Sequence, residues 1–449
     1  MQRKQKREWC YKVSVKLLMR ESFEQHVDEA LLLDCMRCGF CLSSCPTYLH
    51  TEQDEAQSPR GRIALMKAIR EGKVEWDTSI EESFNLCLGC RACEPACPAG
   101  VQYGALIEQT KEAIQEVKPQ KRLEKTVRNI TFNHLFAEKK DLNKVVKLVH
   151  FYQKSGLQKV TRKIGFLKLF PPFLNEMEKA LPEVPRKVEE LTPVKPSTIK
   201  VAFFTGCLME SLFQEINDKT VQLLKLLGAE VVIPKEQQCC GALHGHSGEL
   251  EKGLNNVKIN LQAFDSDDFD YIVNNAGGCG AFLSEYEKHL HDNPDFAEKA
   301  RRFSNKLIDI SSLLINLGII DYLKSLPLSE SKVIATYQDS CHLRNVNKVF
   351  EQPRRILENL PGIQYREMKK ADSCCGSAGI YNLLQPEMAS NILNTKMGYV
   401  KEVNPSILVT SNPGCLMQMK AGIAKEGLSS KMRAVHIVEL VYEQVHRVV

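Results

Sequence analysis

The chain has 449 residues, 43% of them hydrophobic and 26% charged, with a formal net charge of +5. This is the composition of an ordinary soluble globular protein of two or three domains. Seventeen cysteines are too few for a disulfide-dense secreted scaffold, and thiol clusters of this kind belong in a reducing compartment. No apolar run is long enough to span a membrane and no signal peptide is recognisable, so we expect a cytoplasmic protein.

Residues 1–20 form a basic N-terminal extension that includes a lone cysteine, Cys10. Met19 would make an equally good start, so the first eighteen residues are either an extension or a misplaced start. Cys10 is left over when the other sixteen cysteines are grouped into motifs, and we assign it no role.

Two cysteine runs follow, each with the spacing C-x2-C-x2-C-x3-C-P. The first cysteine run is Cys35, Cys38, Cys41 and Cys45, and the second is Cys87, Cys90, Cys93 and Cys97. Three thiolates at this spacing can wrap three irons of a cubane, whereas the fourth lies too far along the chain and reaches the neighbouring cubane. We therefore predict one [4Fe-4S] cluster on Cys35, Cys38, Cys41 and Cys97, and a second on Cys87, Cys90, Cys93 and Cys45.

Two zinc sites or a disulfide framework are the alternatives for these eight cysteines. Thiolate sites admit zinc, but zinc rarely needs eight cysteines in a duplicated spacing. The chain has no G-x-G-x-x-G, P-loop or C-x-x-C-H motif, so we expect neither a nucleotide site nor a c-type haem in it. An iron-sulfur protein without a flavin or nicotinamide site usually passes on electrons that a partner has extracted.

The segments around the two cysteine runs have a helical pattern. Between the runs, Ser58 as N-cap and Pro59 at the first helical position open a helix that Gly72 closes, with Ile63, Leu65, Met66 and Ile69 on one face. We therefore predict an all-α ferredoxin-like domain over 21–117, with helices framing both clusters. Arg60 and Arg62 lie on this helix, and we favour a solvated face for them over a position beside a cluster.

Residues 118–195 are predicted to be a helical basic connector and linker. From Lys118 to Phe170 there are fourteen Lys or Arg against three Asp or Glu, with apolar residues such as Val145 and Phe151 between the lysines. A basic amphipathic helix can lie on an anionic membrane or an acidic partner, but the solvated side of a helical hairpin is the simpler interpretation. The segment lacks interleaved surface aromatics, so no nucleic-acid partner is expected.

The C-terminal half is an internal duplication, with a first repeat over 196–330 and a second over 331–449. Corresponding cysteines are 134, 135 and 136 residues apart, and the pairs are Cys207 and Cys341, Cys240 and Cys375, and Cys279 and Cys415. Each repeat also has a double cysteine, completed by Cys239 and by Cys374. Such even spacing indicates two copies of one unit.

Each repeat alternates strands and helices, which indicates parallel α/β layers. The predicted strands are 200–204, 230–233 and 271–274 in the first repeat and 332–337, 364–367 and 407–410 in the second, and the first strand of each is followed by a helix, 212–227 or 349–360. Ligands bind at the carboxyl ends of such strands, so we expect four thiolates to converge in each repeat. Four thiolates suffice for a [4Fe-4S] cluster or for zinc, and buried cysteines that only pack are the remaining alternative. His244, His246 and His342 lie close to these cysteines and are not assigned as ligands.

Two ferredoxin-type runs followed by two Cys-Cys-Gly repeats resemble the iron-sulfur subunit of glycolate oxidase, from about residue 20 to the end. The phrases that resemble this family are 58–62 (SPRGR), 240–244 (CGALH) and 375–379 (CGSAG). The broader family includes the catalytic subunit of heterodisulfide reductase, the C subunit of anaerobic glycerol-3-phosphate dehydrogenase and lactate-utilisation proteins. The resemblance implies a subunit that takes electrons from a separate FAD-containing glycolate or lactate dehydrogenase and delivers them toward the respiratory chain, without oxidising substrate itself.

The chain departs from the fullest form of the Cys-Cys-Gly motif in both repeats. That form ends in C-x-x-C and holds a noncubane cluster in heterodisulfide reductases, whereas here Ala276 and Asn412 replace the extra cysteine. A catalytic disulfide or quinone reductase is therefore the weaker alternative. A subunit of a lactate or glycerol-3-phosphate dehydrogenase stays open, as does a peripheral location at the inner face of the membrane next to a quinone acceptor.

Overall fold

The computed structural model describes residues 15–118, 139–169, 184–197, 199–327 and 332–447, together with Thr126, Asn129, Glu178 and Leu181. The chain divides into two compact units: unit 1 is Met1–Phe132 with Leu243–Gly253, and unit 2 is Asn133–Ala242 with Leu254–Val449. Cys10, most of the basic extension and parts of the basic connector lie outside the described residues.

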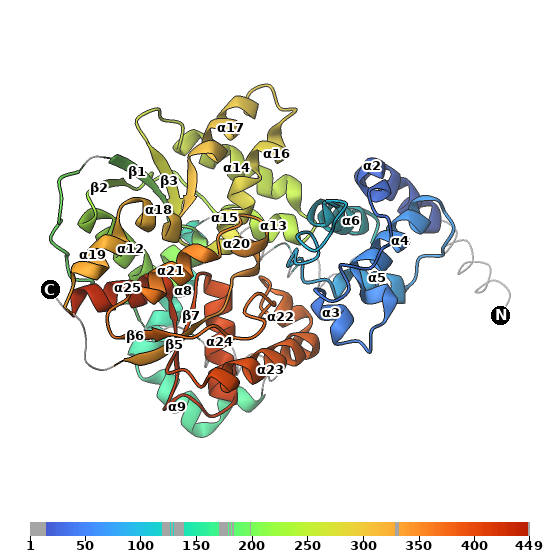
Figure 1. Ribbon diagram of the computed structural model, residues 1–449. Coiled ribbons are helices and arrows are strands. Elements are labelled where there is room, and N and C mark those ends of the chain that lie inside the picture. Colours follow the sequence, from blue (N-terminus) through green and yellow to red (C-terminus); the bar gives the residue numbers. More distant parts are fainter. Residues whose placement is uncertain are drawn as a thin grey trace. The chain divides into compact units, whose positions relative to one another are not determined.

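The regular elements described in residues 15–117 of unit 1 are helices (Figure 1). Residues 15–26 are helical, and the elements that follow are α2 (Glu29–Leu33), α3 (Pro46–Leu49), the 3₁₀ helix η1 (Glu55–Gln57), α4 (Pro59–Arg70), α5 (Thr78–Asn85) and α6 (Tyr103–Val117). The helix predicted after Ser58 is present as α4. The Ser58 Oγ accepts a hydrogen bond from the Gly61 amide at 2.9 Å, as an N-cap does.

A compact apolar core holds these helices together. Met66 of α4, Phe84 of α5 and Leu106 of α6 are buried in it, and the ring of Phe23 in the first helix packs at a tilt against Phe84, with 6.3 Å between ring centroids. Cys87 and Cys93 belong to the same buried cluster. The cysteine runs are therefore irregular loops whose thiols are held against a rigid helical core.

Unit 2 contains two four-stranded parallel sheets with the same topology. The strands are β1 (Ile199–Phe204), β2 (Ala229–Val232), β3 (Tyr271–Asn274) and β4 (Leu307–Asp309) in one, and β5 (Val333–Tyr337), β6 (Ile363–Tyr365), β7 (Ile407–Thr410) and β8 (Arg433–His436) in the other. Their orders are β2-β1-β3-β4 and β6-β5-β7-β8. Parallel pairing was predicted for the first three strands of each repeat. The fourth strands were not predicted, because each continues directly into the helix that follows it, α18 (Ile310–Asn316) or α25 (Ile437–His446), with no turn residues between strand and helix.

The helices of unit 2 surround these sheets (Figure 1). In the connector and first repeat they are α8 (Lys139–Lys154), α9 (Leu157–Ile164), η3 (Phe166–Leu169), α11 (Cys207–Ser211), α12 (Gln214–Leu226), α14 (Leu250–Ala263), α15 (Gly277–Ser284), α16 (Tyr286–Leu290), α17 (Ala297–Lys306), α18 (Ile310–Asn316) and α19 (Ile319–Ser325). Helix α13 (Ala242–His246) belongs to unit 1 apart from its first residue. In the second repeat they are α20 (Cys341–Asn345), α21 (Glu351–Glu358), α22 (Tyr381–Leu384), α23 (Pro386–Val403), α24 (Pro413–Lys425) and α25 (Ile437–His446).

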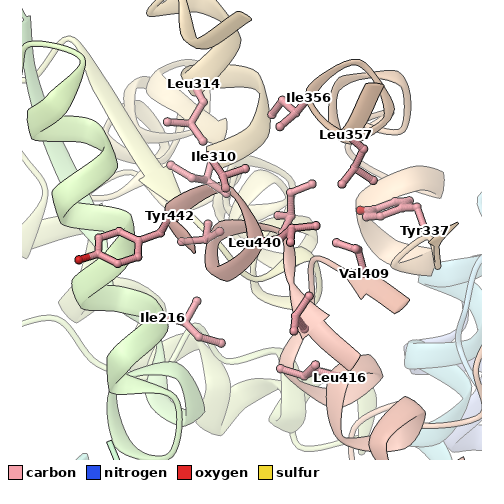
Figure 2. Close-up of a cluster of buried hydrophobic side chains, with 14 of the residues drawn as sticks. Ile216, Ile310, Leu314, Tyr337, Ile356, Leu357, Val409, Leu416, Leu440 and Tyr442 are labelled. Carbon is pink, nitrogen blue, oxygen red and sulfur yellow. The ribbon is translucent and has the colours of Figure 1, made fainter. Parts of the chain in front are cut away.

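One hydrophobic core joins the two repeats (Figure 2). Ile216 of α12 and Ile310 of α18 come from the first repeat, and Val409 of β7 and Leu440 of α25 come from the second, yet all belong to one cluster of buried side chains. Burial of apolar area against the other repeat stabilises each of them. The two sheets are consequently fixed relative to each other within unit 2.

His436 connects the repeats by a buried hydrogen bond, with 2.9 Å between its Nε2 and the Asn275 carbonyl oxygen. Its Nδ1 accepts from the Val438 amide at 3.3 Å, so the neutral ring carries its proton on Nε2. Burial lowers the pKa of His436 to about 4, although its hydrogen bonds to backbone oxygens oppose this. The stability that neutral His436 provides is therefore complete above the unfolded pKa of about 6.5 and is lost as the pH falls toward 4.

We expect His436→Asn, which keeps an N-cap acceptor, to be less acid-sensitive than the parent. Between pH 7.5 and 5.5 the parent should lose about 1 kcal/mol of unfolding free energy relative to the variant, measured by urea unfolding without oxygen. Burial also raises the pKa of Asp309 to about 6, which acts in the opposite direction. That contribution is common to both proteins and cancels in the difference, so equal pH slopes would contradict the assignment.

Candidate metal centres

The two cysteine runs share an unusual backbone conformation. Arg37 and Gly39 in the first run have φ of 58° and 89°, and Gly89 and Arg91 at the matching positions of the second have φ of 63° and 57°. An arginine in this left-handed region costs free energy, so the fold imposes the turn in both runs. The same turn presents three closely spaced thiols of each run to one side.

Cys97 of the second run lies with the first run. Cys35, Cys38, Cys41 and Cys97 line one cavity, with Arg60 at its edge. Burial raises the pKa of Cys41, and the nearby Cys35 and Cys45 raise it further. Four thiols around one cavity are a donor set suited to a cubane and poorly suited to four neutral S–H groups.

Cys45 of the first run lies with the second run. Burial raises the pKa of Cys93 well above its usual range, and Cys90, Cys87 and Cys45 are the next causes. The Tyr103 hydroxyl donates to the Cys87 Sγ at 3.6 Å, and the Gly89 amide donates to the same sulfur at 3.4 Å. Donors aimed at a sulfur favour its anionic, metal-bound form.

Arg62 is the group that the sequence analysis placed wrongly, because its side chain is only 1% exposed and cannot be part of a solvated face. The acceptors that its guanidinium contacts among the described residues are neutral: the Ser83 carbonyl at 2.5 Å, the Thr47 hydroxyl at 3.1 Å and the Gln57 side-chain oxygen at 3.1 Å. Burial lowers its pKa, but Tyr103, Cys87 and Cys45 outweigh this and raise it overall. A buried cation beside these thiols fits an anionic thiolate cluster.

Arg60 has a different environment from Arg62. Its guanidinium makes two hydrogen bonds to the Glu55 carboxylate, at 2.6 and 3.1 Å, and one to the Arg37 carbonyl oxygen at 3.0 Å. The last bond holds the left-handed turn of the first run. Arg60 thus lies beside the first cysteine run and supports the Cys35 loop, so a solvated face was the wrong interpretation for it too, although it is partly exposed and keeps a carboxylate partner.

In the first repeat the four thiols converge at the carboxyl edge of the sheet. Cys207 follows β1, Cys239 and Cys240 follow β2, and Cys279 lies in α15 after β3. Hydrogen bonds join Cys207 to Cys239 and Cys240 to both Cys239 and Cys279, and together with burial they raise the pKa of Cys207 and Cys240 well above the usual range. The structure therefore brings together the four thiols predicted to meet.

The second repeat repeats this arrangement with Cys341 after β5, the double cysteine after β6, and Cys415 in α24 after β7. Cys341 makes a hydrogen bond to Cys374, and this hydrogen bond and burial raise the pKa of Cys341 well above the usual range. A hydrogen bond from Cys374 lowers the pKa of Cys375, but the hydrogen bond to Cys415 and burial raise it overall. Crowded buried thiols of this kind ionise only beside a cation, which fits a metal-binding role better than simple packing.

The described cysteines are free thiols, so a disulfide framework is not present among them. No group of three or more His, Cys, Asp or Glu side chains in the described ranges is arranged around a single-ion position. His246, which was not assigned as a ligand, instead approaches Glu108 of α6 with 2.7 Å between Nδ1 and Oε1, and the Lys111 ammonium donates to its carbonyl oxygen at 3.1 Å. The histidine near the first double cysteine thus pairs with a carboxylate.

Two ferredoxin-type cysteine runs and two buried four-thiol sites at the ends of parallel strands define an iron-sulfur electron-transfer protein. Three family models match the chain: a 4Fe-4S dicluster domain over 31–101, a cysteine-rich domain over 201–284 and 335–420, and the linker region of the glycolate oxidase iron-sulfur subunit over 123–181. No helix in the described part is long and apolar enough to cross a bilayer.

Curated relatives agree with these matches. The chain is 48% identical to the probable glycolate oxidase iron-sulfur subunit of Bacillus subtilis over 95% of this chain and 96% of that one, and 30% identical to the Escherichia coli subunit over 95% and 98%. It is 31% identical to lactate utilization protein A of Oceanobacillus iheyensis over 54% of this chain and 96% of that one. The chain belongs to the family of glycolate oxidase iron-sulfur subunits. It is an iron-sulfur subunit of an oxidoreductase complex.

Proposed function

We propose that this subunit relays electrons from an FAD-containing glycolate dehydrogenase subunit toward the respiratory chain. The observation that supports this most strongly is the crossed arrangement, in which Cys97 lines the cavity of the first run and Cys45 lies beside Cys87 and Cys93. We propose two [4Fe-4S] clusters on those eight cysteines, within an all-helical ferredoxin-like domain over 21–117. The connector over 118–195 and the repeats over 196–330 and 331–449 complete the proposed domain division.

We further propose that Cys207, Cys239, Cys240 and Cys279, and likewise Cys341, Cys374, Cys375 and Cys415, bind iron-sulfur clusters and not zinc. Such clusters, when bound, supply one-electron carriers. The chain itself holds them with thiolates at the carboxyl edges of the two sheets, whereas Arg62 is the buried cation beside Cys45 and Cys87 of the other pair of sites. Oxidation of a hydroxy acid to an oxo acid releases two electrons and two protons to the flavin of the partner. This subunit then takes the electrons singly and changes no carbon compound.

Iron analysis and reconstitution test this proposal. The chain purified without oxygen should contain about eight irons for the two runs, and more if the repeats also bind clusters. It should oxidise no glycolate alone, and its clusters should become reduced when glycolate and the FAD subunit are both added. Glycolate turnover by the chain alone, or reduction of a thiol-disulfide pair by it, would favour the reductase alternative and contradict the relay.

We propose glycolate and not lactate as the substrate of the complex because of how much of the chain each kind of relative matches. The relatives named for glycolate oxidase match nearly the whole chain, whereas lactate utilization protein A matches 54% of it. A panel of glycolate, lactate and glycerol 3-phosphate, presented to the FAD subunit together with this chain, distinguishes the three. Cluster reduction with lactate alone would overturn the choice.

Helices α8 and α9 support a peripheral membrane location. Phe151 and Leu148 of α8 and Ile164 of α9 are 64%, 69% and 67% exposed, and Lys147 and Lys163 flank them. Apolar residues bordered by lysines match the surface of an anionic bilayer, whose acyl chains and phosphates they contact respectively. We propose that this surface binds the membrane, and that a quinone within that membrane accepts the electrons.

Vesicle sedimentation tests the membrane proposal. We expect the chain to bind vesicles rich in phosphatidylglycerol, to bind phosphatidylcholine vesicles weakly, and to lose most binding in Leu148→Ser/Phe151→Ser. The exposed Leu384, on α22, provides a matched control, since Leu384→Ser should bind like the parent. Equal binding by all three proteins would contradict the assignment of this surface.

A further inference from the structure

The two four-thiol sites of unit 2 occupy equivalent places but have different neighbours. Helices α14 and α23 begin at Leu250 and Pro386, so Asn260 of the first repeat matches Lys396 of the second at the same spacing of 136 residues. The same spacing matches Ala276 to Asn412. At two matched positions, a neutral or apolar side chain in the first repeat is thus replaced by a cation or an amide in the second.

Lys396 places a buried positive charge near the second site. Its side chain is 1% exposed, and its ammonium donates to the Lys370 carbonyl oxygen at 2.5 Å. Burial lowers its pKa to about 8, while Cys375 and Cys374, followed by Asp372 and Asp339, oppose this. The hydrogen bond holds this ammonium at the backbone four residues before Cys374.

The carboxylate of Asp339 already has stronger partners than Lys396. Arg354 approaches it at 2.8 Å and Arg344 at 3.0 Å. Asp372 is exposed, so water screens its charge. Thiolates at Cys374 and Cys375 are accordingly the main buried counter-charge that Lys396 can meet.

The matching Asn260 brings no charge to the first site. Its amide nitrogen donates to the Cys239 carbonyl oxygen and to the Tyr286 hydroxyl, both at 3.1 Å, and its oxygen accepts from the Gln238 amide at 2.7 Å. Asn260 thus fixes the backbone of the double cysteine through neutral hydrogen bonds.

Asn412 adds a hydrogen bond to a sulfur of the second site. Its Oδ1 accepts from the Gly278 amide at 2.9 Å, and its Nδ2 lies 3.7 Å from the Cys415 Sγ. Because a backbone amide only donates, the oxygen must face Gly278 and the NH₂ group must face the sulfur. Ala276, the matching residue, has no donor to offer Cys279.

A nearby positive charge and a donor to a ligating sulfur both stabilise the reduced, more negative state of an iron-sulfur cluster. We propose that the second four-thiol site has the higher reduction potential, so that electrons collect there, with Lys396 and Asn412 as the residues that set the difference. This rests on the proposed function, because it requires clusters in both repeats. It also gives the electron path within unit 2 a direction, from the first repeat to the second.

Lys396→Met tests this directly. In a redox titration followed by electron paramagnetic resonance, one cluster signal of the variant should shift to lower potential, and that signal should be absent in Cys415→Ser. Lys396→Arg, which keeps the charge, should leave the potential of this signal close to that of the parent. Lys401→Met on the same helix is the matched control, because Lys401 pairs with Glu426 at the surface and should change no potential. Asn412→Ala should lower the same signal by a smaller amount.

A second measurement covers the case in which Lys396→Met does not fold. Asp372→Asn removes an exposed negative charge near Lys396 and should move the same signal slightly upward. The proposal would be overturned if Lys396→Met and Asn412→Ala left all potentials unchanged. It would also be overturned if these variants shifted the signal of the first four-thiol site, which is the signal that Cys279→Ser removes. Zinc in place of iron in the repeats would overturn it too, yet the relay through the two cysteine runs would survive.

Discussion

Replacing Cys97 by serine is expected to remove the cluster of the first cysteine run and to leave the cluster of the second run in place. The reason is the crossed arrangement: Cys97 lines a cavity with Cys35, Cys38 and Cys41, although it is close in sequence to Cys93. Iron content should fall by about four atoms per chain. Cys45→Ser should have the mirror effect and remove the cluster of the second run.

Double variants separate the crossed from the uncrossed arrangement. If Cys97 and Cys35 bind one cluster, Cys35→Ser/Cys97→Ser loses no more iron than either single variant, because residues acting as a unit are not additive. Cys87→Ser/Cys97→Ser should lose both clusters. The uncrossed arrangement gives the reverse result, with Cys87→Ser/Cys97→Ser losing only one cluster, so iron and acid-labile sulfide per chain decide between them.

Replacing Arg62 by methionine should destabilise unit 1 more than most other single changes. The substitution leaves the acceptors Thr47, Gln57 and Ser83 without their donor and the nearby Cys45 and Cys87 thiolates without a buried counter-charge. Loss of one partner of a buried charge pair costs about 3–5 kcal/mol. We therefore expect a large drop in the urea midpoint and loss of the second-run cluster during purification.

Two variants make this result specific. Arg62→Lys keeps the charge but cannot make the forked hydrogen bonds, so it should retain the cluster at reduced stability. Lys67 lies on the more exposed side of the same helix, and its ion pair with Glu71 is long, at 3.9 Å. Lys67→Met should therefore change stability by less than about 0.5 kcal/mol. Parent-like stability and iron content in Arg62→Met would show that the thiolates do not depend on the buried guanidinium.

The proposed metal ligands could be selected from the sequence because each cysteine motif is local. Three cysteines two residues apart fall within one turn, and the duplicated spacing of Cys207 and Cys341 is visible without coordinates. The strands ending before the first and last cysteines of each repeat were also predicted, and β3 and β7 have the predicted bounds. Short-range pattern and spacing suffice where the chain itself sets the geometry.

The environment of the clusters could not be predicted in this way. Arg62 shares a face of α4 with Met66 and Ile69, at helical spacing i, i+4 and i+7, but its charge favoured an exposed position. Only the packing of α4 against residues 47, 57 and 83 shows that the charge is buried. Lys396 lies in α23, which also carries the surface residue Lys401, and its nearness to Cys374 depends on the fold of the whole repeat. The matched spacing of 136 residues was the one available signal, since it pairs Lys396 with Asn260.

Residue type and spacing along the chain were therefore enough to predict the kind of cofactor, the number of thiols available to it and the duplication of a parallel α/β unit. They did not predict the fourth strand of each sheet, which charges are withdrawn from water, that Asn412 faces a sulfur or that the two repeats have one core. These features became visible only in the folded chain. Burial and hydrogen-bond direction join residues far apart in the chain, and they emerge only when the folded elements exclude water between them.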